Sequence, residues 1–222
     1  MDLPVIFLAF FTATAIAHLA AEAVSSLPGR FATKPFLVLS LALYYACSAV
    51  SVNWLMLAAL AGGWLGDIFL MIPDPQKTRR WFRPGLAAFL LGHVFYIAVF
   101  ASYAGNAGNV PAWGWCALPV YLAAGAVGFR LIAPHAGKMR PAIVAYIVII
   151  VLMGAATVLP LGAVRLQGAL LAMAGALVFM VSDTVNAYNK FAREITHERL
   201  YTMSTYLGGQ FLIVQGYLMF PS

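Results

Sequence analysis

Charged residues are scarce in this chain. Asp, Glu, Lys and Arg make up 9% of the 222 residues, whereas soluble domains contain about 25%. Apolar residues take their place: 63% of the chain is hydrophobic, and the mean hydropathy is +0.89. This composition excludes a soluble globular domain and predicts an integral membrane protein.

Cysteine is also nearly absent. Cys47 and Cys116 each stand alone in an apolar segment, which excludes a disulfide framework and a Cys-x-x-Cys metal site. The N-terminus lacks the Lys or Arg of a secretory signal peptide, because Asp2 occupies that region. We therefore expect the first apolar segment to be retained as a helix. The net charge of +6 is expected to reflect basic loops beside a membrane, not a nucleic-acid-binding surface.

Long apolar windows follow one another along the whole chain. An α-helix needs roughly 17–25 such residues to cross a bilayer, and the breaks between the windows are rich in Pro and Gly. The sequence predicts an all-α integral membrane protein, with one polytopic domain over residues 1–222 and no evident internal repeat. We expect eight transmembrane helices at about residues 3–24, 35–51, 53–72, 85–103, 112–132, 141–159, 164–187 and 200–220.

The basic residues indicate the orientation of these helices. Twelve of the thirteen Lys and Arg fall in or beside the loops that follow helices one, three, five and seven, and Arg165 alone lies on the other side. Basic residues accumulate in cytoplasmic loops. We therefore expect these loops, including KTRRWFR at residues 77–83, in the cytoplasm and both termini outside. The expected location is a bacterial inner or cell membrane.

Two carboxylates interrupt the apolar segments: Asp67 in GWLGDIFLM and Asp183 in GALVFMVSDTVNAYNKF. A charged Asp near the centre of a membrane helix costs roughly 2.5–3.5 kcal/mol on insertion scales, which favours a functional role. At about 1.5 Å per helical residue, both fall in the cytoplasmic half of the membrane. Polar residues in membrane helices usually face the bundle interior or a wet cavity. We expect one cavity, open toward the cytoplasmic leaflet, with Lys34 close to at least one of the two carboxylates. Six further residues are expected to bind or orient the substrate: Lys34, His93, Tyr146, Asn186, Tyr206 and Gln210.

Structural explanations stand beside these functional ones. Lys34 can extend its ammonium to the membrane interface, and His93 can be a buried packing histidine. His18 and Glu22 are four residues apart on one helical face, which suits an interfacial pair better than a catalytic one. Interhelical hydrogen bonds are common in membrane bundles and would equally account for Asn186, Tyr206 and Gln210.

Five motifs together resemble the YhhN family, whose animal members are membrane lysoplasmalogenases. They are KPFLVLSLAL, GWLGDIFLM, GLAAFLLGHVFYI, GALVFMVSDTVNA and YLGGQFLI, and they span residues 34–213 in the family's order. Asn186 stands where the family pattern usually has an apolar residue. The resemblance implies hydrolysis of the vinyl ether bond of lysoplasmalogen, which releases a fatty aldehyde and glycerophosphoethanolamine or glycerophosphocholine. It implies lysophospholipid and membrane lipids as partners, with no nucleic acid, cofactor or metal.

Vinyl ether hydrolysis needs an acid and a base. Protonation of the β-carbon gives an oxocarbenium ion, which water then captures, and two carboxyls in different environments can divide these roles as in glycosidases. By resemblance, Asp67 and Asp183 are the acid/base pair, with the two roles unassigned. Two other functions stay open. One is a small-molecule or lipid transporter or flippase, whose sites usually lie at the membrane midplane, and the other is a metal-dependent hydrolase of ceramidase type, which needs three or four ligands.

Overall fold

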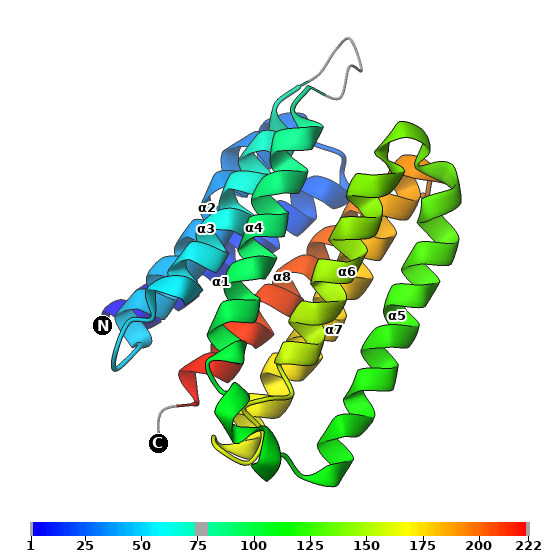
Figure 1. The fold of residues 1–222 in the computed structure, drawn as a ribbon. Helices are drawn as coiled ribbons and strands as arrows, with labels where there is room; N and C mark the ends of the chain where they lie inside the picture. The colour runs from blue at the N-terminus through cyan, green and yellow to red at the C-terminus, as the bar shows by residue number, and fades with distance from the viewer. Residues whose placement is uncertain (1, 74–79, 221–222) are drawn as a thin grey trace. The chain divides into compact units, whose positions relative to one another are not determined.

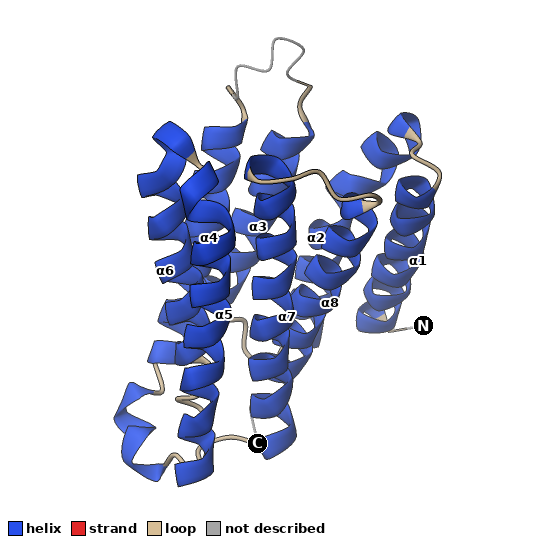
Figure 2. Ribbon diagram, turned by 90° about the vertical axis from the view of Figure 1, so that its right-hand side faces the viewer, coloured by secondary structure: helices blue, strands red, loops and turns tan. Residues whose placement is uncertain are grey.

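The computed structural model describes residues 2–73 and 80–220, and within these ranges it contains α-helices and short 3-10 helices but no strand (Figures 1 and 2). The chain divides into two compact units, Met1–Tyr96 and Ile97–Ser222, which we call the N-terminal and C-terminal units. Lys77 and Arg79 of the expected KTRRWFR loop lie outside the described residues, as does Ser222 at the C-terminus.

Eight α-helices account for most of the described chain. They are α1 (Leu3–Ala23), α2 (Leu27–Ser48), α3 (Trp54–Met71), α4 (Phe82–Ala101), α5 (Ala117–Ile132), α6 (Arg140–Ala156), α7 (Leu166–Phe191) and α8 (Glu198–Leu218). The N-terminal unit holds α1 to α3 and most of α4, which continues across the boundary, and the C-terminal unit holds α5 to α8.

Seven of these helices are long and apolar enough to cross a membrane: α1 to α4, α7, and α5 and α6 with their flanking 3-10 helices. The protein is therefore an integral, multi-pass membrane protein. The eighth helix, α8, has 21 residues but is more polar than the others. Three of its polar side chains, Thr202, Tyr206 and Gln210, are buried, so the polarity of α8 faces other helices. A helix with this pattern needs less apolar surface than one that faces lipid on several sides.

The second helix differs most from expectation, because α2 begins at Leu27 and not near residue 35. Ser26 caps it by accepting a hydrogen bond from the N–H of Gly29 at 3.3 Å, and a proline occupies its first turn, where no intrahelical N–H is needed. The SLPG segment therefore starts the helix. As a consequence, Lys34 lies seven residues inside α2 and not at its first turn. A smaller correction applies to α7, which continues to Phe191.

A tight turn joins α1 and α2 into a hairpin. Ser25 takes a left-handed conformation with φ 53°, and the amide of Ser26 donates to the carbonyl of Ala21 at 2.8 Å. Gly29 permits the close approach of the two helices, because a Cβ there would lie 2.8 Å from the Cβ of Ala21. The hairpin thereby brings the last turn of α1 against the first turns of α2.

Glycines also set the closest helix contacts in both units. In the N-terminal unit, a Cβ at Gly62 of α3 would lie 2.7 Å from the Cα of Gly92 of α4. In the C-terminal unit, Gly175 of α7 faces Gly209 of α8, where added Cβ atoms would lie 2.8 and 3.0 Å from the carbonyl oxygen of the other glycine. Small residues at such contacts let membrane helices pack backbone to backbone.

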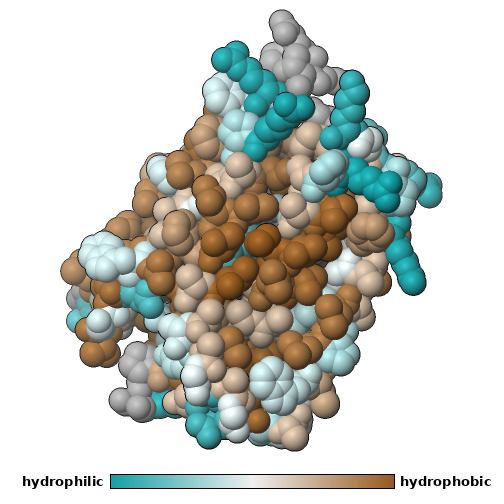
Figure 3. Space-filling model, in the orientation of Figure 1, coloured by the Kyte–Doolittle hydropathy of each residue, from teal (hydrophilic) through white to brown (hydrophobic). Residues whose placement is uncertain are grey.

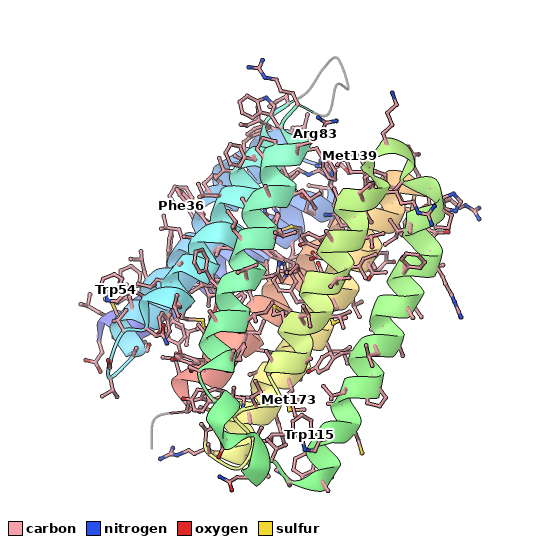
Figure 4. All side chains as sticks on the ribbon, in the orientation of Figure 1. Phe36, Trp54, Arg83, Trp115, Met139 and Met173 are labelled. Atoms are coloured by element: carbon pink, nitrogen blue, oxygen red, sulfur yellow. The ribbon has the colours of Figure 1, made fainter. Side chains whose placement is uncertain are left out.

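The outer surfaces of the helices are apolar. Phe36 of α2 and Trp54 of α3 point away from their helices (Figure 4) and are 44% and 77% exposed. On the α5 and α6 side, hydrophobic side chains cover most of the surface between the helix ends (Figure 3). Contiguous apolar surface of this kind is rare on soluble proteins and is what a lipid environment requires.

Candidate functional site

Asp67 pairs with Lys34 inside the N-terminal unit. Asp67 is 3% exposed on α3, and the Lys34 ammonium on α2 lies 3.3 Å from its Oδ1. The sequence predicts that Lys34 lies close to one of the two aspartates, and the structure places it beside this one. The ion pair offsets the cost of keeping a carboxylate among apolar helices.

Trp64 fixes the same two helices one turn away. Its indole Nε1–H donates to the carbonyl of Pro35 at 2.8 Å, and Trp64 and Asp67 lie three residues apart on one face of α3. Pro35 has no amide N–H, so α2 lacks one backbone hydrogen bond there. The residues beside Lys34 are therefore anchored to α3 by a side-chain hydrogen bond.

His93 is buried on α4, in the part of that helix that belongs to the N-terminal unit. It is 2% exposed, and its Nδ1 lies 2.6 Å from the carbonyl oxygen of Phe89. A carbonyl oxygen can only accept, so Nδ1 carries a proton, and in the neutral ring Nε2 is then the acceptor. Gly92, the preceding residue, lies in the close contact with α3. The structure thus places His93 on the helix that packs directly against the Asp67 helix.

A second polar network joins α1 to α2. Glu22 is 7% exposed and forms an ion pair with the Arg30 guanidinium, whose Nε lies 2.7 Å from Oε2. The fully buried His18 places Nε2 3.6 Å from the other oxygen of Glu22. Its Nδ1 lies 2.7 Å from the hydroxyl of Thr33, which itself donates to the carbonyl of Gly29. The expected pairing of His18 with Glu22 is found, and the network extends to two residues of α2.

Asp183 has a different partner in the C-terminal unit. The Tyr146 hydroxyl on α6 donates to Oδ2 of Asp183 on α7 at 2.6 Å. Both side chains are half-buried, as is Asn186, which lies one helical turn after Asp183. Asp67 therefore faces a cation, whereas Asp183 receives a hydrogen bond from a neutral phenol. These two partners of the carboxylates thus differ in charge.

Tyr206 and Gln210 are buried on α8, with 3% and 1% exposure. The Tyr206 ring packs edge-on against Phe179 of α7, with 5.3 Å between the ring centroids. Phe179 lies one turn before Asp183 on α7, so the glycine contact between α7 and α8 sets the height of Tyr206 and Gln210 relative to the Asp183 helix. Both side chains are therefore buried within the folded chain.

The two aspartates and Lys34 lie toward one end of their helices, whereas His93 and Gln210 lie near the middle of theirs. The α1–α2 turn, the end of α3 and the start of α4 share one end of the N-terminal unit, and the α5–α6 and α7–α8 connections share one end of the C-terminal unit (Figure 1). Asp67 lies four residues from the nearest end of its helix, Lys34 seven and Asp183 eight. At about 1.5 Å per residue, these positions are roughly 6 to 12 Å deep.

Part of this arrangement was not predicted from the sequence. By sequence, Arg30 is only a basic residue beside a loop, and Trp64 and Thr33 have no expected role. The sequence feature that could have identified Arg30 is its position: it lies one helical turn before Lys34 and follows Glu22 within a few residues along the chain. Among the described residues, no group of three or more His, Cys, Asp or Glu side chains could hold a metal ion. The expectation that both aspartates line one cavity stays a prediction.

Comparisons with known proteins agree with the motifs. The sequence model of the YhhN family matches residues 29–217. The chain is 29% identical over 188 residues to the mouse protein named lysoplasmalogenase TMEM86B, covering 85% of this chain and 74% of the mouse protein. It is 27% identical over 191 residues to the rat protein of the same name, covering 85% of this chain and 72% of the rat protein. No solved structure matches the chain.

Proposed function

The chain belongs to the YhhN family, and from this premise we propose that it is a membrane hydrolase that cleaves the vinyl ether bond of a lysoplasmalogen. The products are a fatty aldehyde and a glycerophosphoethanolamine or glycerophosphocholine. Its similarity to proteins named lysoplasmalogenase supports this reaction. The observation that carries the proposal is that two aspartates in apolar helices have partners of different charge, Lys34 and Tyr146.

The two partners suggest how the roles divide. Asp67 faces an ammonium, which suits the carboxylate that stays ionised, stabilises the oxocarbenium ion and accepts a proton from the attacking water. Asp183 receives a hydrogen bond from the neutral Tyr146 hydroxyl at Oδ2, and we assign to this carboxyl the proton that is donated to the β-carbon. Water addition gives a hemiacetal, which breaks down to the aldehyde and the glycerol hydroxyl. His93, Tyr206, Gln210 and Asn186 are proposed to orient water or the headgroup.

We place this chemistry at the cytoplasmic side of the membrane. The connections nearest to Lys34, Asp67, Tyr146 and Asp183 are those beside which twelve of the thirteen basic residues fall, and such loops are usually cytoplasmic. The proposed topology counts α8 as an eighth membrane helix, with both termini outside. Its buried polar face supports this, because a span enclosed by other helices can carry polar groups.

The test is aldehyde release from a lysoplasmalogen by the purified protein, with Asp67→Asn and Asp183→Asn as the decisive variants. Each should lower kcat by at least about 10²-fold, the usual contribution of a positioned general acid or base, while folding and lipid binding are retained. Asp2→Asn is the matched control, because Asp2 is exposed and makes no side-chain capping hydrogen bond.

Further readouts separate the mechanism from its rivals. EDTA should leave the rate unchanged, and the reaction in D₂O should leave one solvent deuterium on the α-carbon of the aldehyde beyond simple exchange. The pH–rate profile should be bell-shaped, and its two apparent pKa values should belong to the coupled pair of carboxyls, not to either one alone. Near-wild-type cleavage by both Asn variants would refute the acid/base assignment.

A further inference from the structure

The network at the α1–α2 hairpin contains a cation that the proposed chemistry does not use. Arg30 lies on α2 four residues before Lys34, so the two side chains project from the same face of the helix about 6 Å apart along its axis. We propose that Arg30, together with Lys34, binds the phosphate of the lipid headgroup. This inference rests on the proposed function, since it names the part of the substrate that this face of α2 recognises.

Each cation keeps hydrogen-bonding capacity after its pairing within the protein. A guanidinium has five N–H groups in a planar fork, and one carboxylate such as Glu22 can engage two of them. An ammonium has three N–H groups, and the Lys34 ammonium is paired with Asp67 Oδ1 at 3.3 Å, which can engage one of them. The remaining donors of the two residues outnumber the two non-bridging oxygens of a phosphodiester.

Partial exposure makes these donors reachable. The Arg30 and Lys34 side chains are 13% and 17% exposed, whereas those of their carboxylate partners are 5% and 4% exposed. The negative charges thus face inward and the positive charges lie nearer the surface. An anion that approaches this part of α2 meets the two cations before it meets either carboxylate.

Glu22 and His18 act as positioning residues for Arg30. The Nε–Oε2 ion pair of 2.7 Å positions the guanidinium, and His18, whose Nδ1 contacts the Thr33 hydroxyl, lies 3.6 Å from the other oxygen of the Glu22 carboxylate. A preoriented guanidinium loses less conformational entropy when it binds a phosphate in its fork. Both positioning residues lie on α1, which precedes the residues matched by the family model.

The chemistry of the ligand follows from the charges. Arg30, Lys34, Glu22 and Asp67 sum to zero net charge when all are ionised, so the face suits a single negative charge better than a dianion. A phosphodiester headgroup carries one negative charge on its phosphate. A neutral glycerol ether with the same alkyl chain offers no charge and no acceptor pair for the fork.

Binding of a lipid that cannot be cleaved tests the inference apart from the reaction. The probes are a saturated alkyl-ether lysophosphocholine and the matching alkylglycerol, measured with purified protein in detergent. We expect wild type to bind the phospholipid at least tenfold more tightly than the alkylglycerol. Arg30→Gln should reduce this preference by about tenfold or more, in line with the loss of charge-assisted hydrogen bonds. Arg130→Gln is the control, because Arg130 is exposed on α5.

A double variant separates recognition from folding. Arg30→Gln alone leaves Glu22 without its cation, which destabilises a buried charge, whereas Glu22→Gln with Arg30→Gln removes both charges. The double variant should regain stability and still lack the preference for phospholipid. If the double variant regains the wild-type preference, or if inorganic phosphate competes as well as the lipid does, the headgroup site is refuted. If Arg30→Gln binds both lipids as wild type does while the Asp67 and Asp183 variants are inactive, the headgroup site is refuted and the proposed reaction stands. If Arg30→Gln loses the preference for phospholipid but the wild-type protein does not cleave vinyl ethers, only the proposed reaction is refuted.

Discussion

Two adjacent glycines of α8 allow a sharp test of how this helix packs. A Cβ at Gly209 would lie 2.9 Å from the backbone nitrogen of Phe179 and 3.0 Å from the carbonyl oxygen of Gly175. A Cβ at Gly208 would meet no heavy atom of the described chain within 4 Å. Backbone atoms cannot move aside as a flexible side chain can, so Ala at position 209 must separate α7 from α8, whereas Ala at position 208 is accommodated.

The two variants share every other effect of the substitution. Gly→Ala in a helix stabilises by up to about 1 kcal/mol in water-based scales, and this gain cancels in the comparison because both residues lie in the same helix. What remains is the cost of overpacking, about 1–3 kcal/mol. We therefore expect Gly209→Ala to be less stable than Gly208→Ala by about 1–3 kcal/mol.

Reversible unfolding in mixed micelles, followed by tryptophan fluorescence, measures this difference. Activity gives a second readout, because Gly209 directly precedes Gln210 and packs against Phe179, four residues before Asp183. Gly209→Ala should lose activity and Gly208→Ala should keep it. Equal stabilities of the two variants, within about 0.5 kcal/mol, the usual error of additive comparisons, would show that the contact between α7 and α8 is not as close as described.

Three further predictions address other parts of the molecule. Lys34→Met should destabilise the protein by about 3 kcal/mol, because the buried Asp67 loses its cation. The double variant Lys34→Met with Asp67→Asn should recover most of this stability. A double variant that is no more stable than Lys34→Met would contradict the ion pair. Tyr146→Phe should lower kcat by about tenfold, because the phenol hydrogen bond stabilises the negative charge that develops on Asp183 as it gives up its proton. Tyr201→Phe, at a residue 54% exposed, should not change kcat. In a background without Cys47 and Cys116, intact cells should label Gly105→Cys with an impermeant thiol reagent and protect Glu194→Cys, and the reverse pattern would overturn the orientation.

The positions of the helices follow largely from hydropathy, because a bilayer demands long apolar segments whatever the tertiary packing. The start of α2 does not, since Pro and Gly occur both in breaks and in the first turn of a helix. Only the Ser26 cap, visible in three dimensions, decides between the two. The packing of α8 was not predictable either, because the sequence alone does not show which neighbouring helices cover Tyr206 and Gln210.

The candidate site, too, could be predicted only in part from the sequence. A carboxylate and an ammonium that are each isolated in apolar segments must find counter-ions, so the pairing of Lys34 with an aspartate was predictable. The choice of Asp67 was not, because it depends on the height at which α2 and α3 meet, which Trp64 and Pro35 set. The Glu22–Arg30 pair escaped prediction for a related reason: it forms only once the turn at Ser25 folds α1 back on α2.

The α1–α2 hairpin also bears on how the chain enters the membrane. A lone charge near the centre of a helix costs roughly 2.5–3.5 kcal/mol to insert, and near the helix ends, where Glu22 and Arg30 lie, the cost is smaller but adds up over two charges. If α1 leaves the insertion machinery alone, Glu22 enters the lipid as an anion without its cation. Insertion of the two helices as a hairpin delivers the pair already neutralised, with the 2.7 Å contact formed. Hairpin insertion would thus couple the two segments through this salt bridge, and the tight turn between them would let the second helix follow the first closely.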